Sequence, residues 1–92
     1  MGGLIVAHFA EINSEKTVLQ VICIRDEDCS YADFPASEPI GQAYISSIGI
    51  EGEWLQTSYN ANFRGVYAGI NYTFDPSLGE YGEFVPPTSV AE

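Results

Sequence analysis

The chain has 92 residues and a mass of 10.0 kDa, which suits one small domain. Its composition, 46% hydrophobic and 13% aromatic with only 17% charged residues, excludes a disordered acidic tail. Thirteen acidic residues against three basic ones give a net charge of −10, which excludes a general nucleic-acid binder and a domain that docks on anionic membranes.

No segment predicts membrane insertion or export. Apolar runs such as Leu4–Ala7 are far shorter than the ~20 residues that span a bilayer. The N-terminus also lacks the positive segment and long apolar stretch of a secretory signal. We therefore expect no membrane and no nucleic acid among its partners, with one α+β domain over residues 1–87 and a flexible tail over 88–92.

The first quarter of the chain predicts a β-hairpin. Residues 3–12 and 17–25 are rich in β-branched side chains, and the polar turn 13–16 separates them. The acidic segment 26–35 follows, and it is expected to be irregular because it is polar and Pro35 blocks regular structure.

One helix is expected over residues 38–48. Ser37 is a suitable N-cap, and Gly49 is a natural C-terminal stop. The spacing predicts that one helical face carries five residues: Ile40, Ala43, Tyr44, Ser47 and Ile48.

The second half predicts further antiparallel strands, over residues 53–59, 65–75 and 81–85. Gly69 inside the second of these suggests a bulge or a close approach of another group. Residues 75–79 predict a hairpin turn, and Pro86-Pro87 ends the last strand. Together these patterns predict an α+β fold, in which an N-terminal hairpin and one short helix precede a small C-terminal antiparallel sheet that packs on the helix.

The two cysteines do not form a disulfide framework, because small secreted scaffolds carry four or more. Cys23 lies within an apolar strand pattern, which predicts a buried free thiol. Neither cysteine has the spacing of a zinc site with His8.

Residues that could support catalysis or metal binding are few. His8 lies in the middle of a strand without a nucleophile motif, so packing or an ordinary hydrogen bond is favoured over a catalytic or pH-sensing role. The carboxylates of segment 26–33 could attract a hard cation, but the calcium-loop pattern is incomplete, and a solvated acidic loop is favoured. We expect a protein that is not an enzyme and has no cofactor and no metal.

Aromatic residues are concentrated in the second half, where eight fall within 31 positions. A thin domain cannot bury all of them, and exposed tyrosines are typical of protein interfaces. Arg64, one of three basic residues, either pairs with a carboxylate or anchors a partner. The residues that we predict to bind a partner are Trp54, Tyr59, Phe63, Arg64 and Tyr67.

One long stretch carries a resemblance. Residues 54–75 read W-x-Q-T-S-Y-N-x-N-F-R-x-x-Y-A-G-I-x-Y-T-F-D, followed by Phe84-x-Pro86-Pro87 and preceded near the N-terminus by Ala7-His8-Phe9-Ala10-Glu11-Ile12. This pattern, which covers roughly half of the chain, resembles small virion-associated proteins of tailed phages that infect cyanobacteria and other aquatic bacteria. Gly2–Val6 ahead of the usual start and the segment 28–35 depart from the pattern.

The resemblance implies a virion structural protein that is made in the bacterial cytoplasm. Its expected role is capsid decoration or cementing, with the major capsid protein as partner and a homo-oligomer, a trimer, on the capsid surface. The alternative is a component of the tail or fibre. A weaker alternative is a small acidic host-directed regulator or inhibitor, for which the carboxylates would have to form a stripe rather than lie scattered.

Overall fold

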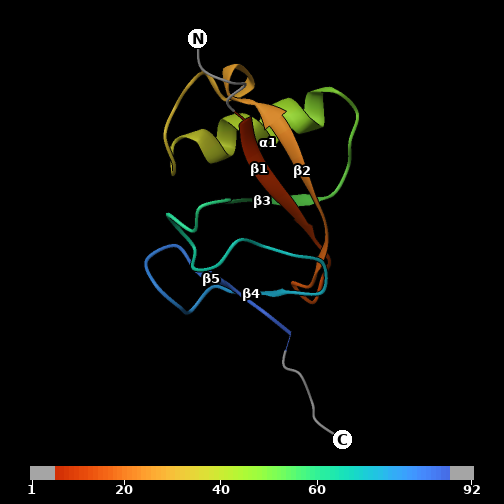
Figure 1. Cartoon of the computed structure of the whole chain (residues 1–92). Coiled ribbons are helices and arrows are strands. Elements are labelled where there is room, and N and C mark those ends of the chain that lie inside the picture. The colour runs from red at the N-terminus through yellow and green to blue at the C-terminus, as the bar shows by residue number, and fades with distance from the viewer. Residues whose placement is uncertain (1–5, 88–92) are drawn as a thin grey trace, which may run out of the picture.

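The computed structural model describes residues 6–87 and contains two antiparallel sheets and one α-helix (Figure 1). Strands β1 (Val6–Ile12), β2 (Val18–Arg25) and β3 (Glu53–Thr57) form a sheet in the order β2-β1-β3. Strands β4 (Thr73–Asp75) and β5 (Glu83–Val85) form a second sheet. The predicted α+β class is confirmed. Of the C-terminal strands, only β3 lies in the sheet that packs on the helix, whereas β4 and β5 pack on the opposite face of that sheet. The expected start of the first strand at residues 3–5 and the tail 88–92 lie outside the described residues.

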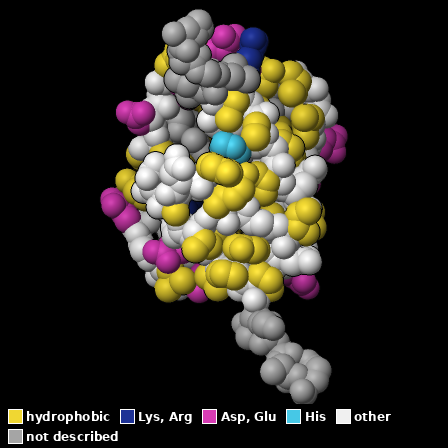
Figure 2. Space-filling view, viewed as in Figure 1, with side chains coloured by type: hydrophobic (Ala, Val, Ile, Leu, Met, Phe, Trp, Pro, Cys, Tyr) yellow, Lys and Arg dark blue, Asp and Glu magenta, His cyan; other side chains and the backbone are white. Residues whose placement is uncertain are grey.

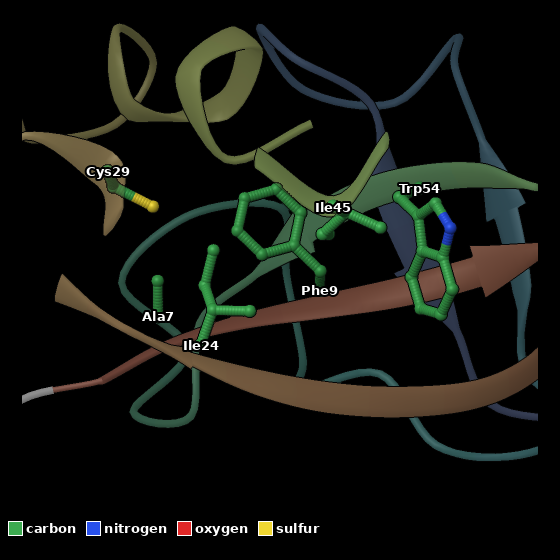
Figure 3. Packing of buried hydrophobic residues seen from close by; sticks show 6 residues of the cluster. All are labelled: Ala7, Phe9, Ile24, Cys29, Ile45 and Trp54. Carbon is green, nitrogen blue, oxygen red and sulfur yellow. The ribbon is translucent and has the colours of Figure 1, made fainter. Parts of the chain in front are cut away.

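The three-stranded sheet carries a hydrophobic core on each face, because successive side chains of a strand point to opposite sides. One face packs against α1 (Ser37–Ser47) and the short 3₁₀ helix η1 (Asp26–Cys29), which lies within the segment predicted to be irregular. Its core is built around Phe9, and Figure 3 shows this side chain among its neighbours. The buried residues of this core are Ala7, Phe9, Ile24, Cys29, Ile45 and Trp54.

The opposite face packs against the C-terminal third of the chain. Its core consists of Ala10, Ile12, Val18, Ala68, Phe74 and Phe84. Residues 71–74 continue the sheet beside the start of β2, where the Val18 N–H donates to the Tyr72 carbonyl at 2.7 Å and the Asn71 N–H donates to the Val18 carbonyl at 2.9 Å. The C-terminal segment thus covers one end of this face with its core residues and bonds to the edge of β2 at the same end.

The helix begins and ends one residue earlier than predicted, and its buried face also differs. Ser37 is a helical residue rather than the N-cap, and its hydroxyl donates to the Gln56 side chain instead of capping a backbone N–H. The residues buried on α1 are Ser37, Gly41 and Ile45, whereas Ala43, Ser47 and Ile48 of the predicted face are exposed.

Gly41 explains why the predicted helical face was wrong. A Cβ at this position would lie 2.2 Å from Cζ of Phe9, so the absence of a side chain lets the helix close over the ring. Because a glycine has no hydrophobic side chain, the spacing of apolar residues in the sequence could not mark this position as buried. The spacing therefore assigned the buried face of the helix to neighbouring positions.

The strand predicted over residues 65–75 is wrong except for its last three residues. Residues 65–72 are irregular. Arg64, just before this segment, has a φ value of 59°, and Asn71 within it has a φ value of 73°. Such left-handed residues interrupt a strand. Gly69 nevertheless meets its prediction of a close approach, since a Cβ there would lie 2.9 Å from the Tyr72 ring.

Cys23 is exposed, which contradicts the predicted buried thiol, whereas Cys29 is buried. Cys23 lies directly opposite His8, at the end of the sheet face that the C-terminal core leaves uncovered. An apolar strand pattern does not reveal which end of a face receives a covering layer.

Candidate protein-binding surface

Three aromatic rings gather at the uncovered end of the sheet face. His8 comes from β1, and Tyr59 and Tyr67 come from the loop after β3. The His8 ring stacks on Tyr59 with centroids 5.7 Å apart and meets the edge of Tyr67 at 5.4 Å. The two tyrosine rings are 5.2 Å apart. We call these residues the aromatic triad.

The triad is partly open to solvent. Tyr59 is 67% exposed, while His8 and Tyr67 are half-buried. Burial lowers the pKa of His8, which favours the neutral imidazole. Burial also raises the pKa of Tyr67, with smaller contributions from Cys23 and Tyr59, so its hydroxyl stays protonated and can donate a hydrogen bond. The triad therefore presents an uncharged surface near neutral pH.

The charge distribution sets this face apart from the rest of an acidic molecule. In Figure 2 the single histidine lies among hydrophobic side chains near the middle of the face, and the acidic side chains in view lie around its rim. A hollow of about 280 Å³ adjoins the triad and is lined by residues of β1, β3 and the following loop, among them Val6, Ser58 and Asn62. An apolar centre with a polar rim is the usual anatomy of a protein interface.

Of the five residues predicted to bind a partner, Tyr59 and Tyr67 lie together on this surface. Trp54 is only 4% exposed and packs in the core beneath the helix. Phe63 is half-buried and stacks face to face on Phe34 with centroids 3.9 Å apart. Trp54 is thus not available at the surface, whereas Phe63 is one of the residues that line the hollow.

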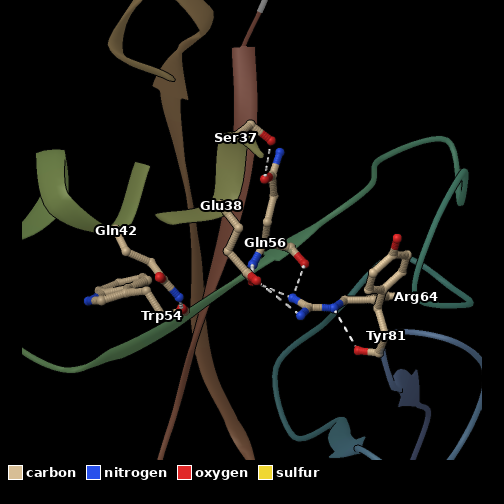
Figure 4. Close-up of polar contacts among 7 residues, drawn as sticks. All are labelled: Ser37, Glu38, Gln42, Trp54, Gln56, Arg64 and Tyr81. Atoms are coloured by element: carbon tan, nitrogen blue, oxygen red, sulfur yellow. Dashed lines mark hydrogen bonds and ion pairs between the residues drawn. The ribbon is translucent and has the colours of Figure 1, made fainter. Parts of the chain in front are cut away.

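Arg64 forms an ion pair inside the fold. Of the two roles predicted for it, pairing with a carboxylate and anchoring a partner, the structure shows the first. Its guanidinium forms a fork with the Glu38 carboxylate, and the side chains of Arg64 and Glu38 are 8% and 14% exposed (Figure 4). It also donates to the carbonyls of Gln56 at 3.1 Å and Tyr81 at 3.1 Å. This arrangement, the Arg64 clamp, ties α1, β3 and the C-terminal loops together.

The clamp positions the loop that carries the two tyrosines. Arg64 lies between Tyr59 and Tyr67 in sequence, and its ion pair anchors the loop to the helix. The Ala68 N–H donates to the Thr57 hydroxyl at 2.9 Å, and the Asn62 N–H donates to the Ser58 hydroxyl at 2.9 Å. Fixed from several sides, the loop presents its aromatic rings in one arrangement, which lowers the entropic cost of binding.

Sequence reasoning missed the participation of His8 in this surface. The alternation of β1 does place His8 on the face opposite Phe9, and Cys23 is its cross-strand neighbour. The meeting of His8 with Tyr59 and Tyr67 depends on the path of an irregular loop, which local sequence patterns do not predict.

Other parts of the molecule offer less for binding. A hollow of about 460 Å³ lies at the end of α1, lined by residues such as Gln42, Ser46 and Trp54, but it exposes almost no aromatic surface because Trp54 is buried. Within residues 6–87 there is no group of three His, Cys, Asp or Glu side chains that could hold a metal ion. The acidic segment instead forms η1, where Glu27 and Asp28 pair with Arg25 at 3.0 and 3.9 Å.

Comparisons with protein-family models, with curated proteins and with solved structures found no match for this chain. In the part of the chain that the structure describes, no helix has the length and apolar character needed to cross a membrane.

Proposed function

We propose that the chain is a bacteriophage virion protein that decorates the capsid, and that the aromatic triad binds the outer surface of the major capsid protein lattice. The observation that carries the proposal is the uncharged cluster of His8, Tyr59 and Tyr67 on a molecule of net charge −10. Tyrosine-centred surfaces with a polar rim are enriched at protein interfaces. The resemblance of residues 54–75 to virion-associated proteins supplies the class of partner.

The rest of the molecule suits this role. The Arg64 clamp holds the binding loop in place, and the carboxylates at the rim leave the centre of the surface free of charge. Many copies on a symmetric shell would add weak individual contacts into strong overall attachment. The acidic residues on the exposed remainder of each copy would keep particles soluble and mutually repelling.

The proposal separates binding residues from supporting residues. Tyr59, Tyr67 and His8 contact the partner, whereas Arg64 and Trp54 support the surface from inside the fold. We therefore expect Tyr59→Ala combined with Tyr67→Ala to weaken attachment to particles at least about tenfold, as for residues at the centre of an interface. Tyr31→Ala is the matched control, because Tyr31 is 71% exposed and follows η1, which packs on the face of the sheet opposite His8.

The test uses purified particles of a phage that encodes the chain. Quantitative mass spectrometry against the major capsid protein is expected to give hundreds of copies per particle. A handful of copies would instead assign the chain to the tail or fibre, and none would favour the host-directed regulator. Equal attachment of the tyrosine double variant and the Tyr31→Ala control would refute the assignment of the surface.

A further inference from the structure

The two outer edges of the three-stranded sheet differ in their hydrogen bonding. On β3, the Gln56 N–H donates to the Glu38 carboxylate at 2.8 Å, and its carbonyl accepts from Arg64. Gln42 donates to the Trp54 carbonyl at 2.6 Å. Side chains therefore occupy the backbone groups of this edge, which blocks the addition of another strand.

The register shows which backbone groups of β2 point outward. Because the Gln56 groups point away from β1, the Phe9 groups that lie opposite them point toward β2, where Phe9 pairs with Ile22. Alternation along β2 then directs the backbone groups of Val21, Cys23 and Arg25 away from the sheet.

Among residues 6–87, the outward backbone groups of Val21 and Cys23 have no hydrogen-bond partner, whereas those of Val18 bond to residues 71 and 72. The Arg25 carbonyl is also occupied, because Arg25 is the N-cap of η1 and its carbonyl accepts the first hydrogen bond of that helix. The outer edge of β2 is thus closed at one end by the C-terminal segment and open from Val21 to the Arg25 N–H. An edge with free backbone groups is a template for strand addition.

The charges around this edge favour a particular occupant and direction. Residues 17–25 contain no carboxylate, and the basic residue Lys16 precedes them. Arg25 at the other end is already paired with Glu27 and Asp28 of its own chain. The three carboxylates of η1 follow directly after Arg25. A second copy that pairs antiparallel brings its acidic η1 toward the Lys16 end, whereas parallel pairing would place the two acidic segments side by side.

We propose that β2 pairs with β2 of a second copy of this chain, antiparallel and with its two-fold axis at Cys23. This register pairs Val21 of each copy with Arg25 of the other, and it uses the free backbone groups of Val21 and Cys23 together with the Arg25 N–H. In this register the paired segment ends where each β2 passes into η1. The pairing therefore does not extend to the β-bulge opposite Glu11 and Ile12, nor to Val18, which is already bonded to another segment of its own chain. The product is one continuous six-stranded sheet.

The proposed dimer has a consequence for binding. The two-fold axis of two antiparallel strands in one sheet is perpendicular to that sheet, so the same face of both copies points to the same side. The two aromatic triads would therefore face one partner surface together, and their binding would be bivalent. A single strand pair buries little area, so we expect association in the micromolar range or weaker in free solution.

Cys23 supplies a direct test because the proposed register places it opposite itself. Directly paired residues have Cα atoms about 5.5 Å apart, a separation that suits a disulfide. The experiment treats the intact chain with the thiol oxidant diamide and follows the disulfide-linked dimer by non-reducing electrophoresis. Burial raises the pKa of the Cys29 thiol and makes it unreactive, so Cys23→Ser is expected to give no dimer.

The matched control moves the thiol along the same edge. In Leu19→Cys/Cys23→Ser the new thiol replaces a half-exposed side chain, but the two copies of residue 19 would lie about 26 Å apart, eight residues at ~3.3 Å each. We expect the wild type to form the linked dimer at least about tenfold faster than this variant. Equal rates would indicate random collision and would overturn the proposal.

A second measurement does not depend on thiol chemistry. Cys23→Pro removes an outward N–H that bonds nothing within the described chain, while Cys23→Ser keeps it. Sedimentation velocity over a range of concentrations is expected to show dimers for Cys23→Ser and monomers for Cys23→Pro. Identical association of the two variants would also overturn the proposal, and it would leave the assignment of the aromatic triad to capsid binding intact.

Discussion

The two edge strands of the central sheet differ in how the hydrogen bonds of their outward-facing backbone N–H and C=O groups are satisfied. The β3 edge is closed by Glu38, Gln42 and Arg64, which reach it from α1 and from the loop after β3. The β2 edge receives residues 71–74 at one end and is otherwise open within the described chain. The difference indicates that one side of the sheet serves the internal stability of the fold, while the other remains available to a partner.

The largest expected effect comes from breaking the closed edge. Arg64→Ala leaves the largely buried Glu38 carboxylate, which is 14% exposed, without its ion-pair partner and removes the hydrogen bond to the Gln56 carbonyl. Loss of one member of a buried ion pair costs about 3–5 kcal/mol of unfolding free energy. Urea denaturation checks this. Arg25→Ala is the control. The ion pair of Arg25 with Glu27 lies at the surface, with side chains 60% and 47% exposed, so it should contribute less than about 1 kcal/mol to the unfolding free energy.

A smaller loss is expected from Gln42→Ala, which removes the single hydrogen bond to the Trp54 carbonyl. The cost should be about 1 kcal/mol, because one neutral hydrogen bond contributes roughly that amount. The same denaturation series measures it. An unchanged unfolding free energy would mean that this carbonyl does not need a side chain to close the edge.

At the open edge, Cys23→Pro should cost less stability than a proline on β3. Gln56→Pro deletes the N–H that binds the Glu38 carboxylate, whereas Cys23→Pro deletes an N–H without an intramolecular partner. Thermal unfolding at low protein concentration compares them, and we expect the melting temperature of Gln56→Pro to lie at least about 5 °C lower. Equal melting temperatures would remove the distinction between the edges.

The smallest effect concerns pH. Burial depresses the folded-state pKa of His8 below its ordinary value of 6.5, so the folded state favours the neutral ring. Its contribution to stability is complete above pH 6.5 and is lost as the pH falls toward the folded-state pKa. Because the ring is half-exposed, the loss should stay below about 1 kcal/mol. Denaturation at pH 7.5 and 5.5 should show it in the wild type and a smaller change in His8→Gln.

The sequence predicted those parts of the fold that depend on local patterns. Alternating apolar residues and a polar turn predicted the β1–β2 hairpin, and the flanking glycine predicted the end of the helix to within one residue. The buried helical face was wrong because Gly41 packs against Phe9, a contact between residues 32 positions apart. Local spacing contains no information about such a contact.

The candidate surface was predicted in part. Tyrosine density singled out Tyr59 and Tyr67, but the same density included Trp54, which the core absorbs. Arg64 could not be assigned because its partner Glu38 lies 26 residues away and is brought near only by the fold. The strand predicted over residues 65–75 failed over residues 65–72 for a related reason, since left-handed residues and long-range hydrogen bonds decide the path of that segment.

Amide hydrogen exchange followed by nuclear magnetic resonance tests the contrast between the two edges most directly. We expect the Gln56 amide to be protected at every protein concentration, because its partner is the largely buried Glu38 carboxylate. The Val21 and Cys23 amides should exchange rapidly in dilute solution and become protected as the concentration rises and β2 pairs with a second copy. Protection of the Cys23 amide equal to that of Gln56 in dilute solution would contradict the account.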